Sequence, residues 1–128
     1  MEVNGLLDIP TKDLIYIYKI SSKYTGHYYI GQTGSMEERM SSHMAIIMRL
    51  IDGGTCVPQK FHKTVVVKIN ELFQQQQKKK LKLQRFVRES LSVYVLALVA
   101  DKETANVVER HYISKGWHDG LCTNVREY

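Results

Sequence analysis

Two short runs rich in isoleucine and tyrosine, joined by a glycine-closed polar segment, constrain the fold of this chain most. The runs are residues 14–20 (LIYIYKI) and 27–32 (HYYIGQ), and the segment between them is SSKYTG, which ends at Gly26. β-Branched and aromatic residues favour strands, and a polar segment that contains glycine favours a reversal of the chain. The sequence therefore predicts a β-hairpin.

The register that we expect for this hairpin places Ile20 opposite His27. Tyr18 then lies directly opposite Tyr29, with the two Cβ atoms roughly 5 Å apart on one face of the sheet. Two phenol rings side by side on one face are the first candidate for a functional site.

The other face of the same hairpin is apolar. The expected register sets Ile17 opposite Ile30 there, so we expect that face to pack against helices and the tyrosine face to stay free. It also sets Tyr16 opposite Gly31, where a ring can lie across a residue that has no side chain.

A helix is predicted directly after the hairpin. Ser35 is suited to be its N-cap, because Glu38 follows three residues later and completes a capping box. The pair Gly53-Gly54 marks its end. Its apolar face is formed at helical spacing by Met40, Met44, Ile47 and Ile51.

The next part of the chain carries a second helix and then a segment of low complexity. The second helix begins at about Phe61, and Val66, Ile69 and Phe73 follow at helical spacing. Residues 74–85 (QQQQKKKLKLQR) are compatible with a solvated helical extension or a mobile loop, and also with a basic strip that faces DNA. That strip would consist of Lys78, Lys79, Lys80, Lys82, Arg85 and Arg88.

The last two elements are a strand and a helix. Residues 91–100 (LSVYVLALVA) are almost unbroken apolar strand formers, which predicts a central strand covered on both faces. Asp101 can cap the final helix, which would end at Gly116. We expect its inner face to consist of Ala105, Val108 and Tyr112.

These elements predict an α+β fold in the order β-β-α-α-β-α, with a three-stranded antiparallel sheet flanked by helices. The length of 128 residues indicates a single domain over 1–128. The net charge of +5 and the pI near 9.2 favour an anionic partner such as nucleic acid.

Several other functional classes are disfavoured by the sequence. Cys56 and Cys122 are too few for a disulfide framework and lack the spacing of a zinc site. There is no stretch near the ~20 apolar residues of a membrane span, and no signal peptide. We therefore expect an intracellular protein, cytoplasmic or nuclear, without a membrane partner.

The helix after the hairpin adds charge to the tyrosine pair. Arg39 and His43 are spaced i and i+4, so they lie on one side of that helix. A cation, an imidazole and two phenols can therefore converge.

The motifs YIYKI and YYIGQT resemble the paired motif of the GIY-YIG nucleases, and the resemblance extends through MEERMSSH, VVERHYISK and LCTNV. It covers about residues 14–125, the expected domain core. The leading glycine of the first motif is Tyr16 here. The family's functional positions fall on Tyr18, Tyr29, Arg39, His43, Glu109 and Asn124.

The resemblance implies a divalent-metal-dependent DNA endonuclease that hydrolyses phosphodiester bonds. Glu109 would hold one Mg²⁺ or Mn²⁺ ion, which stabilises the leaving oxygen, and Arg39 would clamp the phosphate. Tyr18 would be the general base, with its pKa lowered by nearby positive charge, and Tyr29 would orient the water or the phosphate. The roles of the two tyrosines are interchangeable at this point.

The remaining positions have supporting roles in this hypothesis. His43 would share the proton or bind the phosphate, and Asn124 would hold the shape of the site. Cutting both DNA strands would involve a second copy of the chain. The alternative function is a nucleic-acid-binding protein of the same fold with weakened catalysis, for which Tyr16 is the sequence hint.

Overall fold

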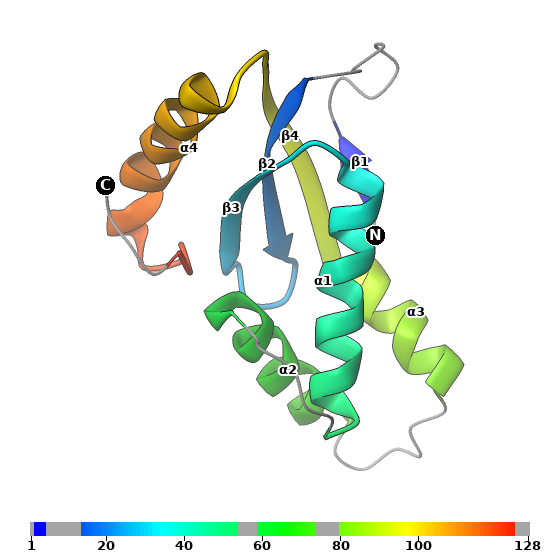
Figure 1. Cartoon of the computed structure of the whole chain (residues 1–128). Helices are drawn as coiled ribbons and strands as arrows, with labels where there is room; N and C mark the ends of the chain where they lie inside the picture. Colours follow the sequence, from blue (N-terminus) through cyan, green and yellow to red (C-terminus); the bar gives the residue numbers. More distant parts are fainter. Residues whose placement is uncertain (1, 5–13, 54–58, 74–79, 125–128) are drawn as a thin grey trace.

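The computed structural model describes residues 2–4, 14–53, 59–73 and 80–124 (Figure 1). Four strands and four α-helices are present there, followed by a short 3-10 helix at Trp117–Asp119. In chain order the elements are β1 (Glu2–Asn4), β2 (Ile15–Ser22), β3 (Tyr28–Thr33), α1 (Met36–Ile51), α2 (Lys60–Phe73), α3 (Lys80–Ser90), β4 (Leu91–Val99) and α4 (Lys102–Gly116).

The sheet has the strand order β1-β4-β2-β3. Strand β2 is antiparallel to both β3 and β4, whereas β1 is parallel to β4. The α+β class and the three antiparallel strands predicted from the sequence are confirmed. The short parallel strand β1 is an addition that the sequence did not predict.

The predicted central strand needs a correction. Among the antiparallel strands β2 lies in the middle, and β4 is interior only because β1 pairs with its outer side. Its first three residues are buried, but Tyr94 is 40% exposed and the rest of the strand is half-buried. Coverage on both faces therefore applies only to the beginning of β4.

Helices cover both faces of the sheet, as Figure 1 shows for α1 and α4 on opposite sides of β3. The larger core joins α1, α2 and α3 to Tyr16, Tyr18 and Ile20 of β2. The smaller core joins α4 to Ile17 and Ile30. The expectation of a free tyrosine face is thus wrong, because both faces of β2 carry large apolar groups that become buried.

The hairpin register also differs from the expected one. Tyr18 pairs with Gly31 and Ile20 with Tyr29, so the partners are shifted by two residues. A shift of two keeps every side chain on its own face. The two tyrosines therefore remain on one face but lie diagonally instead of directly opposite.

Packing of Tyr18 over Gly31 explains this register. A Cβ atom built on Gly31 would lie 2.5 Å from the hydroxyl oxygen of Tyr18 and 2.6 Å from its Cζ. Only glycine leaves space for the ring at this position. Tyr16 lies opposite Thr33 and not, as expected, opposite Gly31.

The hairpin turn and the predicted helix ends agree with the sequence. Gly26 adopts a φ of 76°, which favours glycine. The side chain of Ser35 accepts a hydrogen bond from the Glu38 amide at the start of α1, and Asp101 does so from Thr104 at the start of α4. Helix α1 ends just before Gly53, which also has a φ of 76°.

The segment 74–85 is only partly described. From Lys80 onward it forms α3, whose residues Leu83 and Val87 are buried in the larger core. Helical structure is therefore confirmed for this part, but the expectation of a solvated extension is wrong, because Leu83 and Val87 pack in the core. Among the described residues, no helix is long and apolar enough to cross a membrane.

Candidate active site

A chain of buried hydrogen bonds links Tyr18 on β2 to α1 and α2. The hydroxyl oxygen of Tyr18 lies 2.9 Å from Nε2 of His43, and Nδ1 of His43 lies 2.7 Å from Nε2 of His62. The backbone amide of Gln59 donates to Nδ1 of His62 over 3.0 Å. The exposed fractions of the three side chains are only 1%, 4% and 1%. Burial and hydrogen bonding fix all three rings in place.

Burial sets the charge state of the two histidines. It lowers the pKa of His43 to about 3, with further contributions from His62 and Arg39, and it lowers the pKa of His62 to about 4. Both imidazoles are therefore neutral at physiological pH. His43 brings a polar hydrogen-bonding group to Tyr18 but no positive charge.

The pKa of Tyr18 is raised above its ordinary value. Burial is the main cause, and the neighbouring Tyr29 and Glu109 raise it further, while Arg39 lowers it. The sequence predicted a lowered pKa from nearby positive charge. That prediction is wrong for the protein alone, because the cost of burying a phenolate outweighs the attraction of one arginine.

Tyr29 lies beside Tyr18 but is less buried. The ring centroids are 6.4 Å apart, and Tyr29 is half-buried on β3. The side-chain amide of Gln59 donates to its hydroxyl over 3.4 Å. Gln59 therefore touches both ends of the cluster, through its backbone to His62 and through its side chain to Tyr29.

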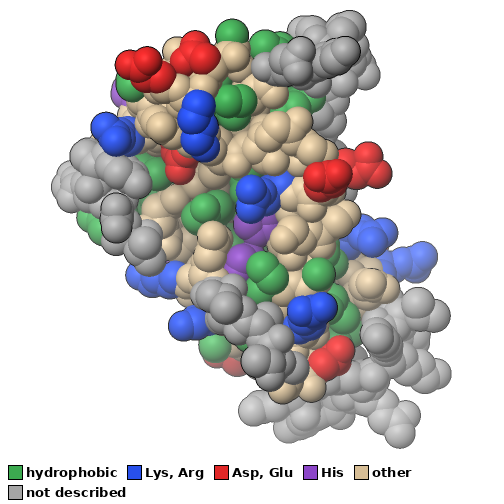
Figure 2. Space-filling view, viewed as in Figure 1, with side chains coloured by type: hydrophobic (Ala, Val, Ile, Leu, Met, Phe, Trp, Pro, Cys, Tyr) green, Lys and Arg blue, Asp and Glu red, His purple; other side chains and the backbone are tan. Residues whose placement is uncertain are grey.

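Arg39 lies on α1, one turn before His43, and its side chain is exposed. It acts on the pKa of both Tyr18 and His43, so its guanidinium is close to the hydrogen-bonded chain. Figure 2 shows histidine side chains at the middle of this face of the molecule, with lysine or arginine side chains around them. The structure brings the imidazole of His43 and the two phenols together, with ring centroids 5.9 to 6.4 Å apart, while Arg39 is placed near them only by its effect on the pKa values of Tyr18 and His43.

Glu109 approaches from α4, on the other side of the edge strand β3. The side-chain amide of Gln32 on β3 donates to its carboxylate. Gln32 also donates to Asn106 over 2.9 Å and accepts from Lys102 over 2.8 Å. These contacts hold the carboxylate at the sheet edge, where its charge reaches Tyr18.

The carboxylate of Glu109 suits a hard divalent cation that takes few of its ligands from the protein. A carboxylate is the oxygen ligand that Mg²⁺ prefers, and Mg²⁺ usually keeps several waters and is bound by one or two carboxylates together with substrate phosphates. Within the described residues there is no group of three or more histidine, cysteine or acidic side chains that could hold a metal. A cation at Glu109 would thus depend on water and substrate oxygens for its remaining ligands.

Asn124 contacts the backbone of β3 beside Tyr29. Its Oδ1 accepts from the Ile30 amide over 3.0 Å, and its Nδ2 donates to the Ile30 carbonyl over 2.8 Å. The thiol of Cys122 donates to Oδ1 over 3.3 Å. The buried amide therefore pairs with the edge of β3 as a neighbouring strand would, which supports the shape-holding role predicted for Asn124.

The predicted basic strip is only partly visible. Lys78 and Lys79 lie outside the described residues, and Lys80 and Lys82 belong to α3, where only their backbone is described. The side chains of Arg85 and Arg88 are exposed on α3. Contact of this strip with DNA stays a prediction.

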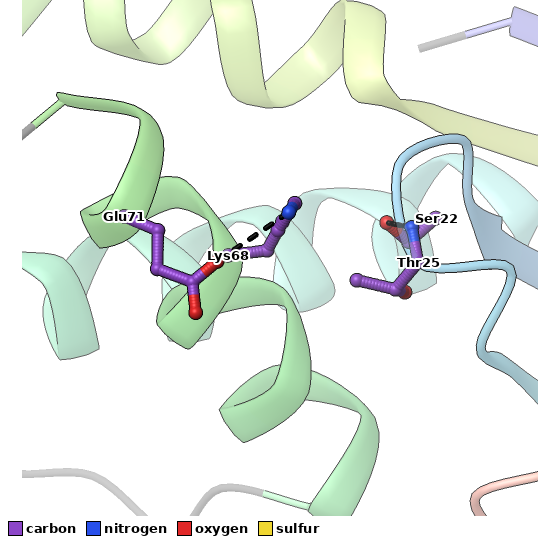
Figure 3. Close-up of polar contacts among 4 residues, drawn as sticks. All are labelled: Ser22, Thr25, Lys68 and Glu71. Carbon is purple, nitrogen blue, oxygen red and sulfur yellow. Dashed lines mark hydrogen bonds and ion pairs between the residues drawn. The ribbon is translucent and has the colours of Figure 1, made fainter.

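A hollow of about 340 Å³, separate from the Tyr18 cluster, lies between the hairpin turn and α2. Figure 3 shows two polar contacts beside it, each 3.4 Å long: the ion pair of Lys68 with Glu71 on α2, and the hydrogen bond that the Thr25 amide donates to Ser22, the last residue of β2. Its lining consists of Thr25, His27, Lys60, Lys63, Thr64, Val67, Lys68 and Glu71. Four of these side chains carry a full charge, three positive and one negative, so the rim is basic.

Sequence reasoning missed three residues that position the site, His62, Gln59 and Gln32. His62 had a usable signal, because it lies on the same helical face as Val65, Val66 and Ile69. A titratable residue on an otherwise apolar helix face needs a buried partner. Gln32 had no comparable signal, since its contact with Glu109 depends on how α4 packs against β3.

Comparison of the chain with protein-family models, with curated proteins and with solved structures finds no match.

Proposed function

We propose that this protein is a divalent-metal-dependent DNA endonuclease that hydrolyses phosphodiester bonds at the Tyr18 site. One observation carries the proposal: the ring centroid of the buried Tyr18 lies 6.4 Å from that of Tyr29 and its hydroxyl oxygen 2.9 Å from Nε2 of His43, and Arg39 and Glu109, from α1 and α4, are close enough to shift the pKa of its hydroxyl. The sequence resemblance to the GIY-YIG nucleases supports the same reaction. A phenol, a guanidinium and a carboxylate around one point are the groups that phosphodiester hydrolysis uses.

Arg39 is the group that would bind the scissile phosphate. Its exposed guanidinium offers two parallel N–H donors to phosphate oxygens, a geometry that lysine does not reproduce. It also attracts negative charge toward Tyr18, because it is the described side chain that lowers the pKa of that hydroxyl. One residue thus binds the substrate and favours the anionic form of the base.

Tyr18 would act as the general base in its phenolate form, which arises when the phenol O–H bond breaks and its proton is released to solvent, a loss that the positive charge of Arg39 favours. A water O–H bond breaks and the proton passes to the phenolate oxygen, while the hydroxide forms a bond to phosphorus and the bond to the 3′ oxygen breaks. Since burial raises the pKa of Tyr18, its phenolate is a strong base once formed. A Mg²⁺ or Mn²⁺ ion at Glu109 would supply the positive charge that stabilises the leaving oxygen.

The alternative, a nucleic-acid-binding protein with weakened catalysis, had Tyr16 as its sequence hint. Tyr16 is 6% exposed and packs in the larger core, and it does not lie opposite Gly31. The ring that replaces the motif glycine therefore leaves the space over Gly31 to Tyr18. This position favours the enzyme over the alternative.

DNA is the proposed partner, and its backbone would contact the basic side chains around the site. Besides Arg85 and Arg88 on α3, the structure adds Lys60 and Lys63, which are exposed on α2 close to Gln59. Phosphate contacts of this kind position a duplex without reading its sequence. A single site cuts one strand, so cutting both strands would take a second copy of the chain or a second binding event.

The proposal is tested by nicking of supercoiled plasmid with Mg²⁺, with Mn²⁺ and with a chelator. Wild-type protein should nick only with metal, and Glu109→Gln should lose cleavage while it still binds DNA, because glutamine keeps the oxygen that accepts from Gln32. Glu103→Gln is the matched control, since Glu103 is an exposed acidic residue on the same helix. Metal-dependent nicking by Glu109→Gln at the wild-type rate would refute the assignment, and DNA binding without any nicking by wild type would establish the alternative.

A further inference from the structure

The backbone amide of Gln59 determines which atom donates and which accepts in each hydrogen bond between His62, His43 and Tyr18. A backbone amide can only donate, so Nδ1 of His62 accepts from Gln59 and carries no proton. An imidazole ring has at least one N–H, so the proton of His62 is on Nε2. That N–H faces Nδ1 of His43 at 2.7 Å.

The same reasoning then applies to His43. Its Nδ1 accepts from His62, so its own proton is on Nε2, which lies 2.9 Å from the Tyr18 oxygen. Each imidazole in the chain is neutral: it accepts a hydrogen bond at Nδ1 and donates one from Nε2. The sequence had left two roles open for His43, sharing the proton and binding the phosphate, and its hydrogen bond to the Tyr18 hydroxyl favours the first.

We propose that His62 is a positioning residue that fixes the direction of the His43–Tyr18 hydrogen bond, so that His43 donates to the hydroxyl oxygen of Tyr18. The consequence for catalysis rests on the proposed function. When Tyr18 is the phenolate, it receives a hydrogen bond from His43 that stabilises the negative charge. When Tyr18 has taken the proton from water, the Nε2–H of His43 still donates to the Tyr18 oxygen, and the new O–H can point away from His43.

Other groups also act on the Tyr18 hydroxyl and enter any pH dependence. They are Tyr29 on β3, Arg39 and His43 on α1 and Glu109 on α4, and His62 on α2 acts through His43. The His62 effect is separable from theirs because only His62 controls which nitrogen of His43 carries the proton.

The direct test is ¹⁵N NMR of the histidine side chains in the wild-type protein, without metal or DNA. His43 should carry its proton on Nε2 and stay in that tautomer from about pH 5.5 to 8, a range in which an ordinary imidazole changes charge. A proton on Nδ1 of His43, or titration of His43 within this range, would overturn the inference. This measurement depends neither on a variant nor on nuclease activity, so it separates failure of the inference from failure of the proposed function.

The kinetic test compares His62→Leu with His62→Gln in single-turnover plasmid cleavage over a range of pH. Leucine removes the donor to His43, whereas glutamine retains an N–H on a side chain of similar reach. The rate of His62→Leu should fall by about tenfold or more across neutral pH, which is the loss expected when the pKa of the Tyr18 base rises by about one unit. His62→Gln should recover most of the rate.

His111→Leu is the control variant, because His111 is exposed on α4. Its pH profile should match that of the wild type. A wild-type rate in His62→Leu, or failure of His62→Gln to recover any rate in a folded protein, would overturn the positioning role of His62.

Discussion

Substitution of Gly31 by alanine tests how tightly Tyr18 is held over the edge strand. The added Cβ would lie 2.5 Å from the Tyr18 hydroxyl oxygen, 2.6 Å from Cζ and 2.9 Å from Cε1. Tyr18 is 1% exposed and hydrogen-bonded to His43, so the ring has no open space into which it can move. Overpacking of this kind costs about 1 to 3 kcal/mol of the free energy of unfolding.

The expected change in Tm follows from the size of the chain. For 128 residues, an unfolding entropy of about 2.1 cal/mol/K per residue makes each kcal/mol worth about 4 °C. Gly31→Ala should therefore lower Tm by about 4 to 11 °C in thermal unfolding followed by circular dichroism.

Gly34→Ala is the matched control, because a Cβ at Gly34 would meet no atom within 4 Å. Its Tm should be unchanged or slightly raised. Cleavage should also fall in Gly31→Ala by about tenfold or more, since the ring that moves carries the proposed base. A Gly31→Ala protein with the Tm and cleavage rate of Gly34→Ala would refute the packing of Tyr18 against Gly31.

The residues of the site and of α3 support three further predictions. Because the pKa values of His43 and His62 are lowered to about 3 and 4 in the folded state, the unfolded chain binds more protons below about pH 6.5. The free energy of unfolding should thus fall as the pH is lowered from about 6.5 to 4, by up to about 1.4 kcal/mol per pH unit for each histidine, and urea unfolding of His62→Leu should show a flatter dependence. Arg39→Lys should keep the charge but lower single-turnover cleavage by about tenfold or more, and a wild-type rate would exclude the phosphate clamp. Changing Arg85 and Arg88 together to glutamine should reduce the salt dependence of DNA binding by a log-log slope of about 0.9 for each phosphate that the protein no longer neutralises, and an unchanged slope would remove α3 from the interface.

Local sequence signals predicted the elements of this fold well. Ser35 and Asp101 cap helices as expected, and Gly26 closes the turn between two strands of the predicted composition. These features depend on residues only a few positions apart, so a pattern in the sequence is sufficient to find them. The short strand β1 has only three residues, which is too few for a periodic signal.

Features that depend on packing between distant elements were not predictable in the same way. The register of the hairpin depends on Gly31 providing space for the Tyr18 ring, and turn composition does not contain that information. The burial of the tyrosine face depends on three helices that pack on the side with Tyr16, Tyr18 and Ile20.

The candidate site shows the same division. The types and order of Tyr18, Tyr29, Arg39 and Glu109 were readable from the sequence; in the structure Tyr29 lies beside Tyr18, and Arg39 and Glu109 are close enough to shift the pKa of the Tyr18 hydroxyl. The direction of the pKa shift of Tyr18 was not readable, because it depends on burial, which a sequence motif does not reveal.

The measurement that tests the central claim most directly is single-turnover cleavage by Tyr18→Phe beside Tyr29→Phe. Phenylalanine keeps the ring and its packing and removes only the hydroxyl, so both variants should fold. If Tyr18 is the general base, Tyr18→Phe should cleave at least about 10²-fold more slowly than wild type in Mg²⁺, and Tyr29→Phe should lose less. A near-normal rate for Tyr18→Phe beside a strongly reduced rate for Tyr29→Phe would contradict the assignment of the base to Tyr18.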